Sequence, residues 1–296
     1  MSSSRTFETV FPVRDYDLAA TLDSGQVFRW RRKDASWTGV VGKHWVRLTS
    51  AQNAIRAQTH APREQWDWLR AFLQTRVDLA AILETFPGDP PMRAAVAACR
   101  GLRLLRQEPW ECLASFILSS TKQIVQIRQI IAQLCDRFGE PVAVPSGEPS
   151  AFAFPPAEKI AGLSESELRA CKAGFRAPYL LATAVEVASG RFNLKALRTL
   201  SHERARAELM NLPGVGRKIA DCVLLFACGF DSAFPVDVWV ERALRRLYFS
   251  RRRVNHKKLR HFAATHFGPH AGYAQQYLFH YMRAKNGMAF HRGAEK

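Results

Sequence analysis

The sequence predicts an α+β protein in which an N-terminal antiparallel sheet precedes a mainly helical domain. Residues 24–50 are rich in Val, Trp and Thr, alternate between apolar and polar, and carry glycines at intervals, which is typical of strands joined by hairpins. From about Arg63 onward, apolar residues recur at helical spacing instead. We therefore expect a sheet domain with flanking helices over residues 1–106 and a helical domain over residues 107–296.

Helical periodicity continues through most of the second part of the chain. It covers residues 63–74, 77–86, 111–139 and 164–190, and then the segment around Lys218. Residues 140–159 contain five prolines and are predicted to be a loop between helices. At 296 residues and 47% hydrophobic content, the chain can bury one large core or two medium ones.

The net charge points to a nucleic-acid partner. Lys and Arg number 43 against 26 Asp and Glu, which gives +17 and a sequence pI near 10.1. An anionic membrane surface is the alternative, but no stretch approaches the roughly 20 apolar residues of a spanning helix. The first eight residues also lack a signal-peptide core. We expect a monomeric, cytoplasmic, nucleoid-associated protein.

The cysteines do not form a metal-binding pattern. There are six, without a CxxC pair and with none after Cys228. An iron–sulfur cluster or a zinc finger is therefore not predicted, and the scattered spacing favours reduced thiols that fill the core. They are Cys99, Cys112, Cys135, Cys171, Cys222 and Cys228.

The segment 212–240 contains the strongest candidates for catalytic residues. A Pro-Gly-Val-Gly turn is followed by Lys218 at the head of an apolar helix of 12 residues that Gly229 should end, roughly 18 Å at about 1.5 Å per residue. The eight residues to Asp237 span up to about 26 Å if extended, so the chain can return to the start of that helix. Asp237 suits the N-cap of the next helix. Lysine and aspartate, 19 positions apart, can meet.

Each of these features also has a purely structural reading. The turn can simply join two helices, Asp237 can be only a cap, and Lys218 can be solvated. Their combination in a basic chain favours function, because Gly214 and Gly216 leave backbone N–H groups uncovered at a helix N-terminus, where a phosphate can bind.

Together these residues resemble the helix-hairpin-helix DNA glycosylases of the glycine/proline/aspartate type. In that superfamily, a lysine just after the hairpin marks members with lyase activity, and the aspartate lies one helix further on. The endonuclease III and adenine-mismatch branches usually carry a four-cysteine cluster that this chain lacks. The resemblance implies no required cofactor or metal, and at most a monovalent cation held by hairpin carbonyls.

Two further segments resemble the 8-oxoguanine DNA glycosylase/lyase branch. SGQVFRW is similar to a motif in which a glycine carbonyl, here that of Gly25, accepts the imidazole-ring N–H that only the oxidised base has. AGYAQQYLFHYMR is similar to a helix in which Gln275 reads the Watson–Crick edge and Phe279 stacks on the base. Cys222 aligns with a cysteine on the base's other side. Without the resemblance, they read as a turn glycine, an exposed amide and core residues.

The resemblance implies a bifunctional enzyme that excises 8-oxoguanine from duplex DNA. The base is flipped out, Lys218 attacks the anomeric carbon, and a Schiff base then permits β-elimination. Asp237 stabilises positive charge on the sugar. Hydrolysis by an Asp-activated water is an alternative mechanism. An alkylated-base glycosylase of the same fold, or a noncatalytic hairpin module that only binds DNA, are the alternative functions.

Three departures from the eukaryotic pattern concern the DNA contacts. Where the eukaryotic enzymes of this branch have three asparagines, this chain has Thr121, Lys122 and Gln123. Where they have an arginine that contacts the opposite cytosine, it has Gln126. A second cytosine-reading arginine is retained as Arg176, and a phosphate-contacting histidine is replaced by Trp239. We expect weak selectivity for cytosine opposite the lesion, and additional phosphate contacts from the basic residues 245–260.

Overall fold

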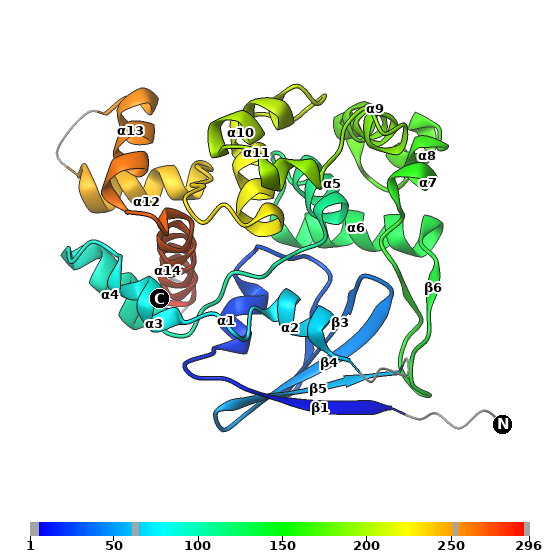
Figure 1. Ribbon diagram of the computed structural model, residues 1–296, viewed down its shortest axis with the longest axis horizontal. Helices are drawn as coiled ribbons and strands as arrows, with labels where there is room; N and C mark the ends of the chain where they lie inside the picture. The colour runs from blue at the N-terminus through cyan, green and yellow to red at the C-terminus, as the bar shows by residue number, and fades with distance from the viewer. Residues whose placement is uncertain (1–5, 61–64, 251–253, 293–296) are drawn as a thin grey trace.

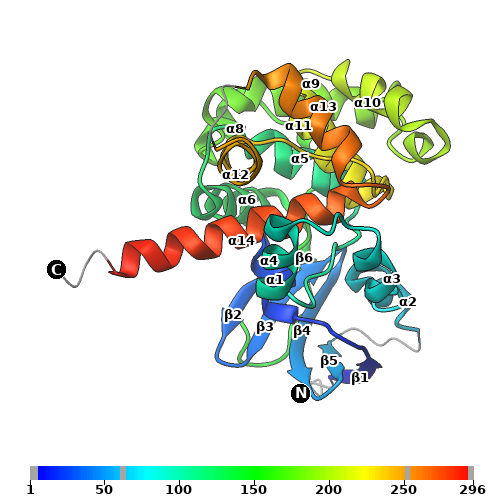
Figure 2. The same ribbon diagram turned by 90° about the vertical axis from the view of Figure 1, so that its left-hand side faces the viewer.

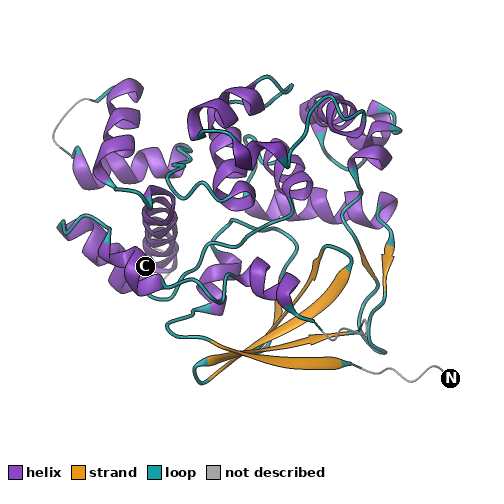
Figure 3. Cartoon of the chain, in the orientation of Figure 1, coloured by secondary structure: helices purple, strands orange, loops and turns teal. Residues whose placement is uncertain are grey.

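The computed structural model describes residues 6–60, 65–250 and 254–292, with side chains up to residue 284. Figure 1 and Figure 3 show a sheet at the bottom of the molecule and a layer of helices above it. The order of elements is therefore the one predicted, and the α+β class is confirmed. No helix of the described residues is both long and apolar enough to cross a membrane.

The sheet has five antiparallel strands in the order β1-β5-β4-β3-β2. Helices α1 and α2 pack on it through a core that includes Leu22, Trp30, Leu48 and Leu69. The elements of this part are β1 (Phe7–Pro12), α1 (Leu18–Asp23), β2 (Arg31–Lys33), β3 (Ser36–Val41), β4 (His44–Ala51), β5 (Ala54–Thr59) and α2 (Asp67–Leu73).

Residues 24–30 depart from the predicted strand pattern. They follow α1 as a series of bends, and β2 begins only at Arg31. The buried Gln26 explains the difference, since its side chain donates to the carbonyl of Arg103 at 2.8 Å and accepts from the N–H of Leu105 at 2.8 Å. The Gln26 side chain thus takes the place of a neighbouring strand as hydrogen-bond partner for this backbone. It also attaches the turn to residues 103–105.

The rest of the chain is mainly helical. Its helices are α3 (Leu79–Glu84), α4 (Pro90–Ala98), α5 (Pro109–Leu118), α6 (Ile124–Phe138), α7 (Ala157–Ala161), α8 (Glu165–Ala170), α9 (Ala177–Ala188), α10 (His202–Met210), α11 (Arg217–Val223), α12 (Val238–Tyr248), α13 (His256–His266) and α14 (Ala271–Arg292). A π-helical turn, Leu224–Cys228, extends α11, and short 3-10 turns cover Gly174–Arg176 and Ala196–Thr199.

The proline-rich segment 140–159 is more ordered than the predicted loop. It contains two short antiparallel strands, β6 (Pro141–Val142) and β7 (Ala151–Phe152). Val142 and Ala153 pack against Val40 and Trp45 of the main sheet. Apolar side chains between the prolines therefore attach the connection to the N-terminal part.

Helix α14 joins the two parts of the molecule. Figure 2 shows it passing between the upper helices and the region of the sheet, and it packs against α4 and α12. Leu79 of α3 and Met92 of α4 belong to the large helical core although both precede residue 106. The domain boundary at residue 106 stays a prediction. All six cysteines are buried and free, as expected for core residues.

Candidate active site

The hairpin lies between α10 and α11. Gly214 has φ +75°, and an added Cβ would come within 2.6 Å of the Tyr179 side chain, so both conformation and space require glycine. Gly216 is the exposed N-cap of α11, and a Cβ added there would have open space for 4 Å around it. The helical segment after it ends at Gly229 in the left-handed conformation, φ 88°, where the sequence predicts its end.

A cavity of about 1060 Å³ lies beside this hairpin. It is bordered by α11, by the start of α12, by α13 and α14, by the loop before α6 and by the turn after α1. The predicted residues that line it are Gly25, Thr121, Lys122, Gln123, Cys222, Gln275, Phe279, Lys218 and Asp237. Residues from both ends and the middle of the sequence therefore converge on one space, while Arg176, Gly214 and Gly216 lie outside its lining.

Lys218 and Asp237 share the cavity without pairing. The Lys218 amine lies 3.4 Å from the Ser119 hydroxyl and 5.0 Å from the centre of the Phe116 ring. Asp237 caps α12, and its carboxylate accepts from the Val240 N–H at 2.7 Å. The two side chains form no ion pair within the described chain. The amine is consequently held by a hydroxyl and an aromatic face, while the carboxylate is fixed by a helix terminus.

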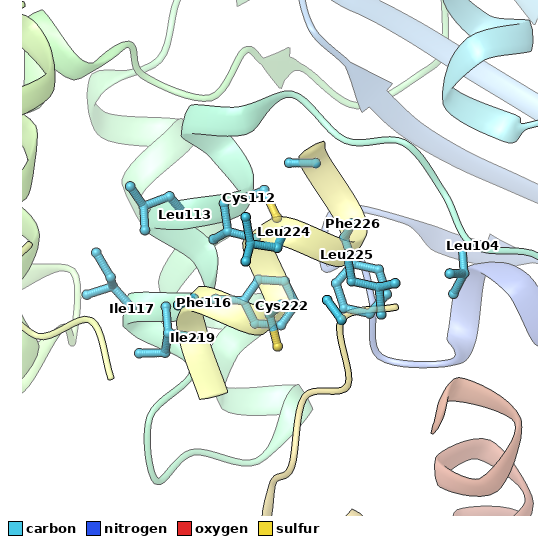
Figure 4. Close-up of a cluster of buried hydrophobic side chains, with 14 of the residues drawn as sticks. Leu104, Cys112, Leu113, Phe116, Ile117, Ile219, Cys222, Leu224, Leu225 and Phe226 are labelled. Carbon is cyan, nitrogen blue, oxygen red and sulfur yellow. The ribbon is translucent and has the colours of Figure 1, made fainter. Parts of the chain in front are cut away.

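Cys222 lies one turn after Lys218 on the apolar wall of the cavity. Figure 4 shows it next to Phe116 of α5 and near Phe226, within the large buried cluster. The rings of Phe116 and Phe226 stack with centres 5.6 Å apart. Burial raises the pKa of the Cys222 thiol to about 12, although the Lys218 charge opposes this. The thiol is therefore neutral at physiological pH and offers a polarisable surface rather than a nucleophile.

The opposite side of the cavity is formed by α14 and the turn after α1. Gln275 is 4% exposed, and its Oε1 has no hydrogen-bond partner among the described residues. A buried acceptor without a donor, at the edge of a cavity, suits a ligand N–H. Gln276 donates to the Ser24 carbonyl at 2.9 Å and so joins α14 to the turn that holds Gly25.

Gly25, in the same turn, lies close to the Phe279 ring of α14. Its φ is +81°, and an added Cβ would meet the Ile124 side chain at 3.0 Å and the Phe279 ring at 3.3 Å. A larger residue would occupy the space between the turn and the ring. The absence of a side chain thus keeps the backbone next to Phe279 accessible.

Arg176 supports the loop before α6 rather than facing the cavity. It is 2% exposed, and its guanidinium donates to the Ser120 carbonyl at 2.7 Å and to the Thr121 hydroxyl at 2.7 Å. Thr121 has φ +56°, an uncommon conformation that these bonds help to hold. The role of Arg176 as a base contact stays a prediction. Gln126 bonds back to the Gln123 N–H at 3.2 Å and completes a capping box for α6.

A buried ionic cluster that lines the same cavity as Lys218 was not predicted from the sequence. Arg206 of α10 and Asp221 of α11 form a bond of 2.6 Å, and both side chains are almost fully buried. Burial raises the pKa of the Asp221 carboxyl, and the Arg206 charge opposes this. Arg217 lies 3.8 Å from the same carboxylate. This cluster fastens α11, and with it Lys218, to the first helix of the hairpin.

Other cavity residues carried little or no signal in the sequence. Ser119 and Phe116 look like ordinary helix residues, and Arg283 looks like one more cation in a basic chain. Trp239 is 39% exposed beside Asp237, with the Arg242 guanidinium 5.5 Å from the centre of its ring. Within the basic stretch 245–260, residues 251–253 lie outside the described part of the chain.

Family models match nearly the whole chain. Residues 9–113 match the N-terminal domain of 8-oxoguanine DNA glycosylase, and residues 114–268 match the HhH-GPD superfamily of base excision DNA repair proteins. The N-glycosylase/DNA lyase OGG1 of Arabidopsis thaliana is 31% identical over 91% of this chain and 79% of its own length. The N-glycosylase/DNA lyase of Saccharomyces cerevisiae is 33% identical over 81% of this chain and 70% of its own.

Solved structures agree with these matches. The Clostridium acetobutylicum 8-oxoguanine glycosylase/lyase, in complex with double-stranded DNA containing cytosine opposite 8-oxoG, superposes with a TM-score of 0.87 at 31% identity. That match covers 97% of this chain and 100% of the other. The 3-methyladenine DNA glycosylase of Archaeoglobus fulgidus shares the fold, with a TM-score of 0.78 at 22% identity.

Proposed function

Since the chain belongs to the 8-oxoguanine DNA glycosylase family of the HhH-GPD superfamily and is an N-glycosylase/DNA lyase, we propose that it excises 8-oxoguanine from duplex DNA through a covalent intermediate on Lys218. One observation carries the proposal. A single cavity brings the Lys218 amine and the Asp237 carboxylate together with an unpartnered amide oxygen, an aromatic ring and an open glycine turn. This set can hold a flat base and attack the sugar attached to it.

Base recognition would use the two sides of the cavity. A base flipped out of the duplex is held by stacking and by hydrogen bonds to its edges. Phe279 and the neutral Cys222 thiol would contact its two faces. The Gln275 Oε1 would accept from an N–H of the Watson–Crick edge, and the Gly25 carbonyl would accept the ring N–H that oxidation creates.

Lys218 would then perform both reaction steps. Its uncharged amine forms a bond to C1′ of the sugar while the bond from C1′ to the base breaks, and the base leaves with that electron pair. The amine loses a proton, the sugar ring opens, and a Schiff base remains. Loss of a proton from C2′ then breaks the C3′–O bond and releases the 3′ phosphate. The Asp237 carboxylate stabilises positive charge on the sugar throughout.

The DNA backbone would bind at the hairpin and the neighbouring loop. The exposed Gly214 and Gly216 present backbone N–H groups to a phosphate. A monovalent cation would be held by backbone carbonyls of the same turn, which are hard oxygen ligands. The Pro213 carbonyl of this turn accepts from the Thr183 hydroxyl at 3.1 Å. No reaction step depends on that cation. We place this activity in the cytoplasm, at the nucleoid, with the protein acting as a monomer.

Opposite-base selectivity would be weak. Thr121, Lys122 and Gln123 line the cavity where the eukaryotic pattern has asparagines, and Arg176 is occupied by the loop. We expect similar excision rates opposite all four bases, measured in single-turnover assays on four otherwise identical duplexes. A strong preference for cytosine would contradict this part of the proposal.

Borohydride trapping tests the mechanism. With duplex DNA containing 8-oxoguanine, the wild-type protein should give a covalent adduct that Lys218→Gln abolishes. Lys43→Gln is the matched control, because that side chain is 73% exposed and pairs with Glu140 at the turn between β3 and β4. Hydrolysis by an Asp-activated water would instead give base release without any adduct.

A further inference from the structure

Helix α14 contributes Arg283 to the cavity lining, in addition to the predicted residues Gln275 and Phe279. Gln275, Phe279 and Arg283 follow each other at intervals of four residues, which places them on one helix face. All three line the cavity. The Arg283 guanidinium lies 5.5 Å from the centre of the Phe279 ring. It also lies 3.4 Å from the position that a Cβ on Gly25 would take.

Arg283 is held in place by one bond and keeps most of its donors. Its Nη1 donates to the Asp23 carbonyl at 3.2 Å, and this is its only hydrogen bond to any residue described in the structure. The Asp23 carboxylate is already paired with Arg128 at 2.8 Å. A guanidinium carries five N–H donors. Donors therefore remain for a ligand that enters next to Gly25.

The electrostatic setting also favours an acceptor at this place. Burial lowers the pKa of the Arg283 guanidinium, while the charges of Asp23 and Asp237 oppose this. The group stays charged, since arginine does not deprotonate in proteins. A partly desolvated cation with free donors is costly unless something accepts from it.

We propose that Arg283 is a specificity-determining residue that donates to a carbonyl oxygen of the flipped base. This inference rests on the proposed function. The ring N–H of 8-oxoguanine, which the Gly25 carbonyl would accept, lies between two carbonyl oxygens, and a donor beside Gly25 reaches that edge. The Gly25 carbonyl would then accept from the ring N–H of the base, and Arg283 would donate to the carbonyl oxygen next to it. The cation also attracts the electron pair that the base carries away when its bond to the sugar breaks.

The alternative for a cation near DNA is contact with a phosphate. Two substrates separate these roles, because a preformed abasic site has phosphates but no base. We expect Arg283→Leu to slow excision of 8-oxoguanine about tenfold to hundredfold in single-turnover assays, as for loss of one charged hydrogen bond. Strand nicking at a preformed abasic site should be unchanged. Arg283→Lys should recover part of the excision rate, because it restores a donor.

Arg76→Leu removes an equal charge from an exposed side chain near α2, and its excision rate should match the wild type. Unchanged excision by Arg283→Leu would overturn the inference, and so would an equal loss on abasic DNA, which indicates a phosphate contact or a folding defect. If the wild type itself forms no adduct with 8-oxoguanine DNA, the proposed function fails; if it does and Arg283→Leu excises normally, only this inference fails.

Discussion

The two sides of the cavity are built in different ways. On the reaction side, Lys218 and Asp237 lie 19 positions apart. The carboxylate is fixed by the N-terminus of its own helix, while the amine contacts the hydroxyl of Ser119 at the end of α5. On the recognition side, Gly25 and Phe279 come from opposite ends of the sequence, and the Gln275 Oε1 has no hydrogen-bond partner among the described residues. Under the proposed function, the reaction would depend on the rigid frame that α11 and α12 form, and base specificity would depend on how α14 packs against the turn.

The strongest test of that rigid frame is the buried ion pair between Arg206 and Asp221, which joins α10 to α11. Asp221→Ala removes the buried carboxylate that pairs with Arg206 and should reduce the free energy of unfolding by about 3–5 kcal/mol. Urea denaturation measures this. Glu203→Gln changes a second carboxylate that pairs with Arg206. The Glu203 side chain is 80% exposed, so stability should change by less than about 1 kcal/mol. Similar values for both variants would show that the pair does not anchor α11.

Asp237→Asn should lower the excision rate without lowering the stability of the fold. Asparagine caps a helix about as well as aspartate, so α12 should keep its stability. Loss of the charge should reduce the single-turnover excision rate by roughly 10²- to 10³-fold, as for removal of a group that stabilises transition-state charge. Thermal unfolding serves as the control. An excision rate within threefold of the wild type, with an unchanged Tm, would remove Asp237 from the mechanism.

Gln275→Ala should affect recognition alone. The variant removes the unpartnered acceptor, and we expect excision of 8-oxoguanine to fall about tenfold to hundredfold. Nicking at a preformed abasic site should be unaffected, because no base is present there. If both activities fell together, the residue would be shaping the cavity rather than reading the base.

Much of the reaction side could be predicted because its signals are local. A glycine turn, a helix stop at Gly229 and a cap at Asp237 act over a few residues, and the fold class follows from periodicity. The recognition side required a resemblance to other proteins, because nothing local distinguishes Gly25 from an ordinary turn glycine. Residues 24–30 were wrongly expected as part of a strand, since the bonds of Gln26 to a segment far along the chain are invisible in the sequence.

The positions of Arg176 and Arg283 could not be predicted from the sequence either. In a chain of net charge +17, each arginine looks like a DNA contact. In the structure, Arg176 holds the loop at Thr121, whereas Arg283 lines the cavity and makes one hydrogen bond to the described residues. Which arginine is buried, and against what, depends on tertiary packing rather than on charge.

The smallest expected effect concerns Trp239, an exposed aromatic residue in the lining of the cavity. Trp239 is exposed next to Asp237, and an aromatic ring there can stack on DNA. Trp239→Ala should weaken binding of an abasic-site duplex by about 1 kcal/mol, roughly fivefold, in fluorescence anisotropy. Trp239→Phe should retain most of the affinity. Equal affinities of Trp239→Ala and wild type would leave the ring without a role in DNA binding.

The most direct test of the central claim is the site of the covalent bond. Borohydride-trapped complexes with 8-oxoguanine duplex can be digested, and the modified peptide can be identified by mass spectrometry. We predict one modified peptide, carrying the sugar remnant on Lys218 at the head of α11. A remnant on another amine, such as the cavity residue Lys122, would contradict the account.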